Sequence, residues 1–321
     1  MPISVNRRAM RIVKELIIRR DELQVKVEKR PKGATIIDTG VAAPGGYAAG
    51  LMSVEICMAG LCDLSLASRT YGDFDLPTIY VTTDSPSISA LGSQFAGWEI
   101  KTGDYFAMGS GPARALALKP KEIYAEIEYR DKSDSAVIVL ESDKPPPDEV
   151  ISHIASECHV RPSRLYVVVT PTSSVAGSVQ ISGRIVETGI YKLRRLGLDH
   201  KKILYASGSA PVPTIHPESA RAMGRTNDAL YYGGETYYTV SFEDDEKLKE
   251  MVSKAPSSTA TEYGRPFYEI LKAAGFDFYK IDPNLFAPAV VTVNNIKTGN
   301  TYRSGYINAN VLKETMAVSA T

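Results

Sequence analysis

The sequence predicts an α/β protein built from two domains. At 321 residues the chain is longer than one hydrophobic core usually supports, so two cores are expected. Apolar segments that suit buried strands, such as LYVVVT at residues 165–170, are followed by stretches with helical apolar spacing. A proline cluster at residues 144–148 is the clearest signal of a linker or of a helix start. We therefore expect a first α/β domain over residues 1–147 and a second over residues 148–321.

The charge balance argues against a nucleic-acid-binding protein. The 37 basic residues equal the 37 acidic residues, so no global positive field attracts phosphates. No apolar run approaches the roughly 20 residues that span a bilayer, and Arg7, Arg8 and Arg11 interrupt the segment where a signal peptide needs an apolar core. The three cysteines are too few and too irregular for a disulfide framework. We expect a cytoplasmic protein with neither a nucleic-acid nor a membrane partner.

The first predicted domain begins with an amphipathic helix. Ser4 can cap a helix that continues to about residue 20, and this helix could also pack on the second domain. Its apolar stripe comprises Ala9, Ile12, Val13, Leu16 and Ile17. Further along the chain, strands are expected at residues 23–28, 78–82, 123–129 and 136–141, with an ordered loop at residues 83–92.

Residues 105–116 contain a glycine-rich turn that can bind an anion. The apolar segment YFAM leads into Gly109 and Ser110, and Pro112 opens a run of helix formers that includes Arg114. Ser110 can cap that helix, and free backbone N–H groups at such a turn favour an anionic ligand group, which Arg114 can assist. The pattern is neither a Walker sequence nor GxGxxG, so a plain strand–turn–helix connection fits it at least as well.

A second small-residue loop is predicted at residues 207–211. Its GSAP sequence, which contains Ser209, is similar to the GSGP at residues 109–112, and each follows an aromatic-containing strand. Two pseudo-repeated α/β halves that offer such loops to a common cleft would explain the similarity. Four matching positions can also arise by chance.

A helix is predicted over residues 173–196, capped by Ser173 or Ser174. Its apolar row comprises Val179, Val186, Ile190 and Leu193, and its polar row comprises Gln180, Arg184, Glu187 and Tyr191. Gly177, Gly183 and Gly189 each weaken a helix by roughly 1 kcal/mol relative to Ala, so we expect a close approach to its backbone. By spacing alone, an exposed Arg/Glu pair is the favoured interpretation.

The helix predicted from residue 217 to about residue 231 carries further candidates. Arg225 and Asn227 can line a ligand site, although ordinary interface chemistry would use them equally well. His153, Cys158 and His159 lie close in sequence but lack the CxxC or HxxxH spacing of a metal site. No metal ligands are predicted.

Several stretches together resemble one family. They are GVAAPGGYAAGL at residues 40–51, YFAMGSGPARAL at 105–116, SVQISGRIVETGIYKL at 178–193, YASGSAPVP at 205–213 and AMGRTNDALYYGG at 222–234. Over nearly its whole length the chain is similar to the methenyltetrahydromethanopterin cyclohydrolases, enzymes of one-carbon metabolism in methanogenic and related archaea and some methylotrophic bacteria. The resemblance implies a two-domain α/β subunit with a large ligand cleft between the domains. It also implies that there is no metal or cofactor, and that the subunits form a homo-oligomer, expected to be a trimer.

The resemblance also implies an activity and a catalytic pair. The expected reaction is reversible hydrolysis of the cyclic methenyl group of the pterin substrate to the N5-formyl derivative, in methanogenesis or its reversal. The family's G-R-x-x-E pattern maps onto Arg184 and Glu187 in GRIVE. Glu187 then serves as general base and acid on water, and the neighbouring glycines can leave room for a bulky pterin. Gln180 and Tyr191 are second candidates for holding water or the pterin edge.

Two other classes of protein remain possible at this point. A non-catalytic pterin-binding or carrier protein would use Arg184 and Glu187 only as a structural ion pair. A redox enzyme would need a nicotinamide or flavin fingerprint, and no GxGxxG follows a predicted strand.

Overall fold

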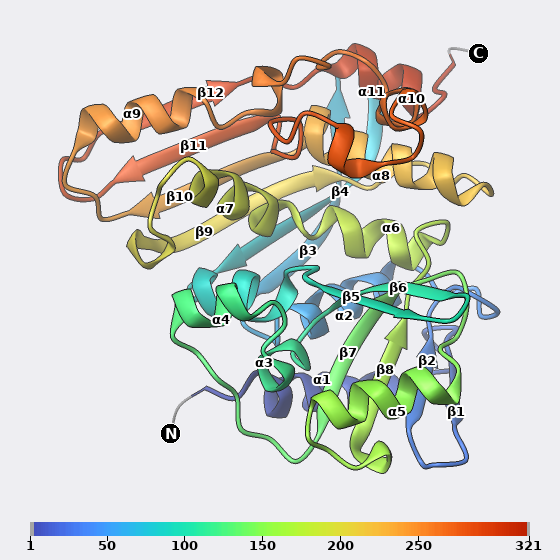
Figure 1. Cartoon of the computed structure of the whole chain (residues 1–321). Coiled ribbons are helices and arrows are strands. Elements are labelled where there is room, and N and C mark those ends of the chain that lie inside the picture. Colours follow the sequence, from blue (N-terminus) through green and yellow to red (C-terminus); the bar gives the residue numbers. More distant parts are fainter. Residues whose placement is uncertain (1–2, 320–321) are drawn as a thin grey trace. The chain divides into compact units, whose positions relative to one another are not determined.

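The computed structural model describes residues 3–319, which form two compact units. The first unit comprises the described part of Met1–Asp63 together with Ser87–Gln180. The second comprises Leu64–Pro86 together with the described part of Ile181–Thr321. Each unit combines helices with a six-stranded sheet, which confirms the α/β class (Figure 1). The boundary expected between residues 147 and 148 falls inside the first unit.

The elements of the first unit alternate between helix and strand. Its strands are β1 (Lys26–Lys29), β2 (Thr35–Asp38), β5 (Trp98–Thr102), β6 (Tyr105–Ser110), β7 (Ala136–Glu141) and β8 (Leu165–Val169). Its helices are α1 (Val5–Ile18), α2 (Tyr47–Cys57), α3 (Arg114–Ala117), α4 (Lys121–Ile127), α5 (Asp148–Glu157) and most of α6 (Val175–Ser182), with a π-helical segment at Ser87–Gln94.

The sheet of the first unit explains why the expected boundary lies inside it. The strand order is β1-β2-β8-β7-β6-β5, so β8 lies between β2 and β7 and runs parallel to both. The β1/β2, β6/β7 and β5/β6 pairs are antiparallel. Since β8 follows the proline cluster in sequence and fills the middle of the sheet, that cluster connects two parts of one unit.

Helices cover both faces of the central strands of this sheet. Alternate residues of β7 and β8 point to opposite faces, as a strand buried on both sides requires. Val137, Val139 and Val168 pack with α1 and α2, whereas Ile138, Leu140 and Val167 pack with α5. Helix α1 lies in this unit against α2 and β7, and the Ser4 side chain caps it by accepting from the Arg7 backbone N–H. The predicted capping residue and apolar stripe of this helix are confirmed.

The second unit contains the remaining elements. Its strands are β3 (Asp63–Tyr71), β4 (Phe74–Thr83), β9 (Ile203–Pro211), β10 (Glu235–Val240), β11 (Val290–Asn295) and β12 (Thr301–Gly305). Its helices are α7 (Ile185–Arg195), α8 (Ser219–Gly233), α9 (Asp245–Ser253), α10 (Phe267–Ala273) and α11 (Ala309–Thr315).

The sheet of the second unit has the order β12-β11-β10-β9-β4-β3. Strand β10 runs parallel to β11 and antiparallel to β9, and β4 and β12 pair antiparallel with β9 and β11. Helix α7 contacts β9 and β10, α8 contacts β9, and α10 and α11 pack on α8. Strand β10 therefore contacts α7 while being hydrogen-bonded to a neighbouring strand on each side.

Two local predictions in the first unit are wrong. Of residues 123–129, expected as a strand, the first five lie in α4, in which Ile123 and Tyr124 are buried. The expected loop at residues 83–92 overlaps the π-helical segment Ser87–Gln94, whose residues from Ser89 to Gln94 are buried. Both segments are too short for apolar spacing to separate helix from strand or loop, so packing decides their conformation.

The two similar glycine-containing sequences occupy different positions in their sheets. GSGP closes β6, where Gly111 turns the chain with φ +92°, whereas GSAP is part of β9 itself. The parallel pairs also differ, since β8 has two parallel neighbours in the first unit and β10 has one in the second. The short sequence similarity is therefore not accompanied by the same strand pairing.

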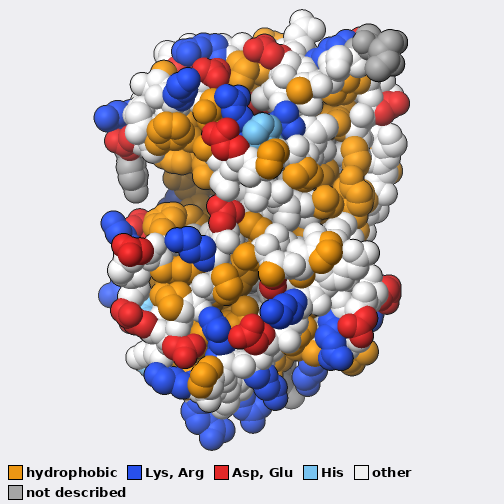
Figure 2. All heavy atoms as spheres, turned by 90° about the vertical axis from the view of Figure 1, so that its right-hand side faces the viewer, with side chains coloured by type: hydrophobic (Ala, Val, Ile, Leu, Met, Phe, Trp, Pro, Cys, Tyr) orange, Lys and Arg blue, Asp and Glu red, His pale blue; other side chains and the backbone are white. Residues whose placement is uncertain are grey.

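The surface carries charge of both signs. Figure 2 shows acidic and basic side chains interspersed over most of the face in view, in keeping with the equal totals of the two kinds. Within residues 3–319, no helix is both long enough and apolar enough to cross a membrane.

Candidate active site

The helix predicted over residues 173–196 is interrupted. It consists of α6 and α7, separated at Gly183 and Arg184, where the Arg184 N–H donates to the Ile181 carbonyl at 2.9 Å, a three-residue step. At the start of α6, the Ser174 hydroxyl accepts from the Gly177 N–H at 3.0 Å, which confirms one of the two predicted capping residues. Because the break interrupts the helical register, Gln180 does not share a helix face with Glu187.

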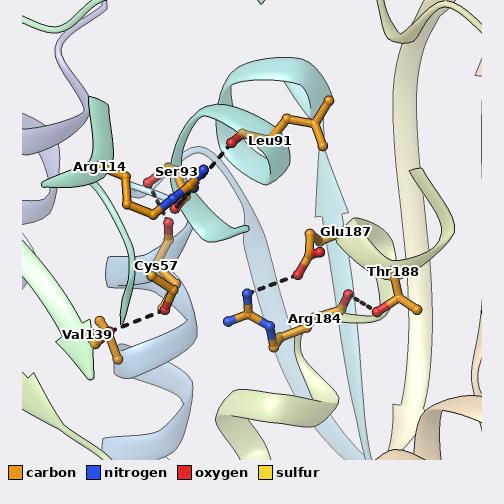
Figure 3. A network of polar contacts seen from close by, with 9 residues as sticks. Cys57, Leu91, Ser93, Arg114, Val139, Arg184, Glu187 and Thr188 are labelled. Atoms are coloured by element: carbon orange, nitrogen blue, oxygen red, sulfur yellow. Dashed lines mark hydrogen bonds and ion pairs between the residues drawn. The ribbon is translucent and has the colours of Figure 1, made fainter. Parts of the chain in front are cut away.

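Arg184 and Glu187 form a buried ion pair at the start of α7. Arg184 Nη2 and Glu187 Oε2 are 3.0 Å apart, and each side chain is only 9% exposed (Figure 3). The pair is therefore not the exposed surface pair that spacing alone favoured. The Arg184 carbonyl accepts from the N–H and the hydroxyl of Thr188, at 2.9 and 3.0 Å, so the backbone next to the guanidinium is also held. Removing two such charges from water is costly, so a buried pair of this kind needs the close contact that these two side chains make.

Two buried tyrosines adjoin this turn of α7. The Tyr238 hydroxyl donates to the Val186 carbonyl at 2.9 Å. Burial raises the pKa of both Tyr231 and Tyr238 well above the usual value, and the negative charge of Glu187 raises both further. The two hydroxyls therefore stay protonated beside the glutamate.

The second-choice candidates on this stretch are split between the two helices. Gln180 lies on α6 and is 2% exposed. Tyr191 lies on α7 and is half-buried, with the Arg195 guanidinium 6.0 Å from its ring centroid. Of the two, Tyr191 shares a helix with Glu187, one turn further along.

Gly109 and Ser110 are the last two residues of β6, so the turn begins only at Gly111. Gly109 pairs with Trp98 and with Leu140 inside the sheet. The Ser110 hydroxyl lies 3.6 Å from the Cys57 thiol, and α3 has no side-chain cap, so the predicted capping role of Ser110 is wrong. The helix that follows is only Arg114–Ala117, because the chain bends again at the left-handed Leu118.

Arg114 points into the first unit and is fully buried. Its guanidinium donates to the carbonyls of Leu91 and Ser93, at 3.2 and 3.1 Å (Figure 3). It also donates to the Lys119 carbonyl at 2.8 Å. These bonds attach the π-helical segment to α3. Such contacts give this arginine a structural task, and its role at an anion site stays a prediction.

Ser209 lies on the other face of its sheet from α7. A Cβ on Gly208 would meet side-chain atoms of Ile185 and Val186 in α7, so residue 208 faces that helix and Ser209 faces away. A hollow of about 410 Å³ opens on this opposite face, lined by Tyr80, Val81, Thr82, Ser207, Gly208, Ser209, Glu235, Thr236, Tyr237, Val290 and Thr292. Arg69 donates to the Ser209 hydroxyl at 3.2 Å and pairs with Glu235 at 2.5 Å. The sheet of the second unit therefore lies between the Ser209 side chain and α7, the helix that begins next to Arg184 and carries Glu187.

Arg225 and Asn227 are engaged with the chain itself. The Arg225 guanidinium donates to the Thr214 hydroxyl at 2.8 Å and to the Ile215 carbonyl at 3.0 Å. The Asn227 amide donates to the Met223 carbonyl at 2.8 Å and accepts from the Tyr231 hydroxyl at 2.6 Å. Asn227 is thus connected, through Tyr231, to the surroundings of Glu187.

Asp228 is a buried acid that the sequence did not reveal. It is fully buried and accepts from the Phe267 N–H at 2.8 Å and from the Thr315 hydroxyl. Burial raises the pKa of Asp228 to about 8. No local pattern indicates this, because the burial depends on α10 and α11, which follow much later in the chain.

Metal-ligating side chains are not gathered at any of these places. Among residues 3–319, no group of three or more His, Cys, Asp and Glu side chains is arranged to hold a metal ion. Within the same residues, Cys57, Cys62 and Cys158 form no disulfide.

Comparison with known proteins places the chain in a family. The family model described as cyclohydrolase (MCH) matches residues 4–316. This chain belongs to the MCH cyclohydrolase family. Every candidate residue described above lies inside the part that matches the MCH family.

Relatives from the MCH family agree with the whole chain. A methenyltetrahydromethanopterin cyclohydrolase of Methanococcoides burtonii is 46% identical over 316 residues, which are 98% of this chain and 99% of the relative. Proteins of the same name from Methanocella arvoryzae and Methanothermobacter marburgensis are 49% identical over 313 residues and 46% identical over 319 residues. These alignments cover 97% and 98% of this chain, and 98% and 100% of the relatives. The agreement therefore extends through both units.

Proposed function

We propose that this chain is a methenyltetrahydromethanopterin cyclohydrolase. It hydrolyses the cyclic methenyl group of 5,10-methenyl-tetrahydromethanopterin to the N5-formyl derivative, reversibly, as a step of one-carbon metabolism. The supporting observation is identity of 44 to 49% with relatives of that name over 97 to 98% of the chain. The buried Arg184 and Glu187 pair supplies a base and a cation within that matched region.

Glu187 is the proposed general base and acid. The methenyl carbon bridges two nitrogens as a cation, so it is electrophilic before any catalysis. As water adds to this carbon, the carboxylate takes one proton, and the protonated carboxyl group then gives it to N10 as the carbon–N10 bond breaks. The hydroxyl on the carbon loses its proton as the formyl carbonyl forms. Each hydrolysis therefore consumes one water and releases one proton.

Arg184 is the proposed partner that keeps Glu187 oriented. A guanidinium 3.0 Å from the carboxylate favours its ionised form, which a base requires. A cationic substrate acts in the same direction. Tyr191 and Gln180 stay second candidates for holding the water or the pterin edge.

The remaining features of the enzyme follow from the same family. We propose that hydrolysis needs no metal or bound cofactor, that the subunits form a homotrimer, and that the enzyme works in the cytoplasm on a small pterin. Turnover should then persist after exhaustive treatment with EDTA. Light scattering on the purified protein should give three times the chain mass, and a monomeric mass would contradict the trimer.

The decisive experiment removes the base without changing its size. In Glu187→Gln the amide cannot take a proton from water, so hydrolysis should fall by about 100-fold or more. Loss of the methenyl chromophore, followed by absorbance without added cofactor, measures the rate. Arg184→Ala should also reduce kcat, and an effect on KM alone would make Arg184 a binding residue.

The second unit offers a matched control. Glu218 and Arg221 form an Arg/Glu pair of the same three-residue spacing at 3.0 Å, but their side chains are 52% and 48% exposed. Glu218→Gln should leave hydrolysis unchanged. Near-normal turnover in folded Glu187→Gln would refute the catalytic role. Tight substrate binding by the wild-type protein without loss of the chromophore would favour the carrier instead.

A further inference from the structure

Tyr238 joins the central strand of the second unit to the turn that carries Glu187. It lies on β10, is 0% exposed, and donates its hydroxyl to the Val186 carbonyl at 2.9 Å. Val186 directly precedes Glu187 in α7, so the tyrosine oxygen contacts the helix backbone next to the residue that carries the carboxylate.

Gly189 provides the space that this contact needs. A Cβ at this position would lie 2.0 Å from the Tyr238 hydroxyl oxygen and 3.0 Å from the ring carbon that carries it. Any side chain would thus collide with the tyrosine. The close approach predicted for Gly189 is confirmed, but the space is filled by Tyr238 of the same unit and is not left for a pterin.

The strand that carries Tyr238 is hydrogen-bonded to a neighbouring strand on each side. In β10, Tyr238 pairs with Ala206 of β9 and with Val293 of β11. Burial raises the pKa of its hydroxyl far above the usual value, so the group remains a donor at every pH at which the protein is handled. Its hydrogen bond therefore joins the helix backbone to a strand that is paired on both sides.

We infer that Tyr238 is a positioning residue for the hydrolysis. Its hydroxyl fixes the first turns of α7, and through them it sets the placement of the Glu187 carboxylate beside Arg184. This inference rests on the catalytic roles proposed for those two residues. A small displacement of an acid–base group costs rate even when substrate binding is preserved.

The test removes only the hydroxyl. Tyr238→Phe should lower kcat about tenfold, with KM changed by less than about twofold, because the carboxylate is misplaced while the binding surface is retained. Tyr232→Phe is the control, since Tyr232 is also fully buried in this unit and donates its hydroxyl to a backbone carbonyl, that of Arg265, at 2.6 Å. It should show a similar change in Tm with an unchanged kcat. Equal kcat values for the two variants would overturn the inference.

Further variants separate this inference from the catalytic proposal. Near-normal turnover in Glu187→Gln would refute the catalytic pair, whatever Tyr238→Phe does. In Glu187→Asp the carboxylate is already displaced, so adding Tyr238→Phe should cost less than it does in the wild type. Gly189→Ala alone should lower kcat, and adding Tyr238→Phe should restore part of it, since the colliding oxygen is gone. Fully additive losses, or a wild-type kcat in Gly189→Ala, would count against a positioning role.

Discussion

Two Arg/Glu pairs have the same spacing in sequence but differ in their exposure to solvent. Arg184 with Glu187 and Arg221 with Glu218 are both three residues apart and both meet at 3.0 Å. The first pair is 9% exposed at both side chains and the second about half exposed. A surface pair contributes little because water and salt screen it. The charges of a buried pair interact more strongly, because less water and salt screen them.

Asp228 provides a prediction about stability and pH. Its pKa is about 8 when folded and near 3.9 in an unfolded chain. Between these values the folded state holds a proton that the unfolded state has lost, so this residue lowers stability as pH rises from about 4 to 8. The linkage slope reaches about 1.4 kcal/mol per pH unit. Asp228→Asn should remove this slope, as measured by urea unfolding at pH 5 and pH 8.

A control for this prediction uses an exposed acid. Asp75 is exposed and its carboxylate accepts from the Thr70 hydroxyl, so Asp75→Asn should leave the pH dependence of the wild type in place. If Asp228→Asn lost the same stability at both pH values, the lost hydrogen bonds, and not the ionisation, would be responsible.

Single helices and strands end where other groups take over the hydrogen bonds of the backbone. Four successive N–H groups, from Gly40 to Ala43, donate to the Asp38 carboxylate at 2.6 to 3.1 Å. Asp38 ends β2, so its side chain orders the connection from β2 to α2. One carboxylate thus replaces the ladder bonds that an irregular segment lacks.

Asp38→Ala should therefore destabilise the protein markedly. The variant leaves four donors without their acceptor, and a charged acceptor is worth more than a neutral one. We expect a loss of about 2 to 4 kcal/mol in the free energy of unfolding, measured with denaturant. Asp38→Asn keeps one carbonyl oxygen and should lose less. Equal losses in Asp38→Ala and Asp75→Ala would show that the loop does not depend on this carboxylate.

At the scale of the whole molecule, neither unit is a continuous piece of chain. Leu64–Pro86 leaves the first unit to supply β4 and most of β3 to the sheet of the second, and the chain then returns. The first sheet also joins the two segments of its unit, since β8 of the later segment pairs with β2 of the earlier one. Contacts between distant segments therefore hold each unit together.

This arrangement predicts that the chain cannot be divided at the proline cluster. A fragment of residues 1–147 lacks β8 and leaves β2 and β7 without their shared neighbour. Separately produced fragments of residues 1–147 and 148–321 should show no cooperative thermal transition by circular dichroism. A cooperative transition in the first fragment alone would contradict the prediction. The intact chain, prepared in parallel, is the control.

The limits of sequence reasoning follow from the range of each interaction. Helix caps such as Ser4 and Ser174 are local, because a side chain bonds a backbone group three residues away, and both were predictable. The apolar strand at residues 165–170 was also predictable from its own side chains. Spacing did not reveal the break at Gly183 and Arg184, because a helical pattern can continue across a turn.

The α/β class and the capped helix ends follow from the amino-acid sequence, and the family resemblance singles out Arg184 and Glu187. The burial of this pair, the inward direction of Arg114 and the position of Ser209 on the opposite face of the sheet from α7 follow only from the folded chain. Burial and facing depend on which distant segments pack together, as Tyr238 does against Gly189, and no short stretch of sequence contains both partners.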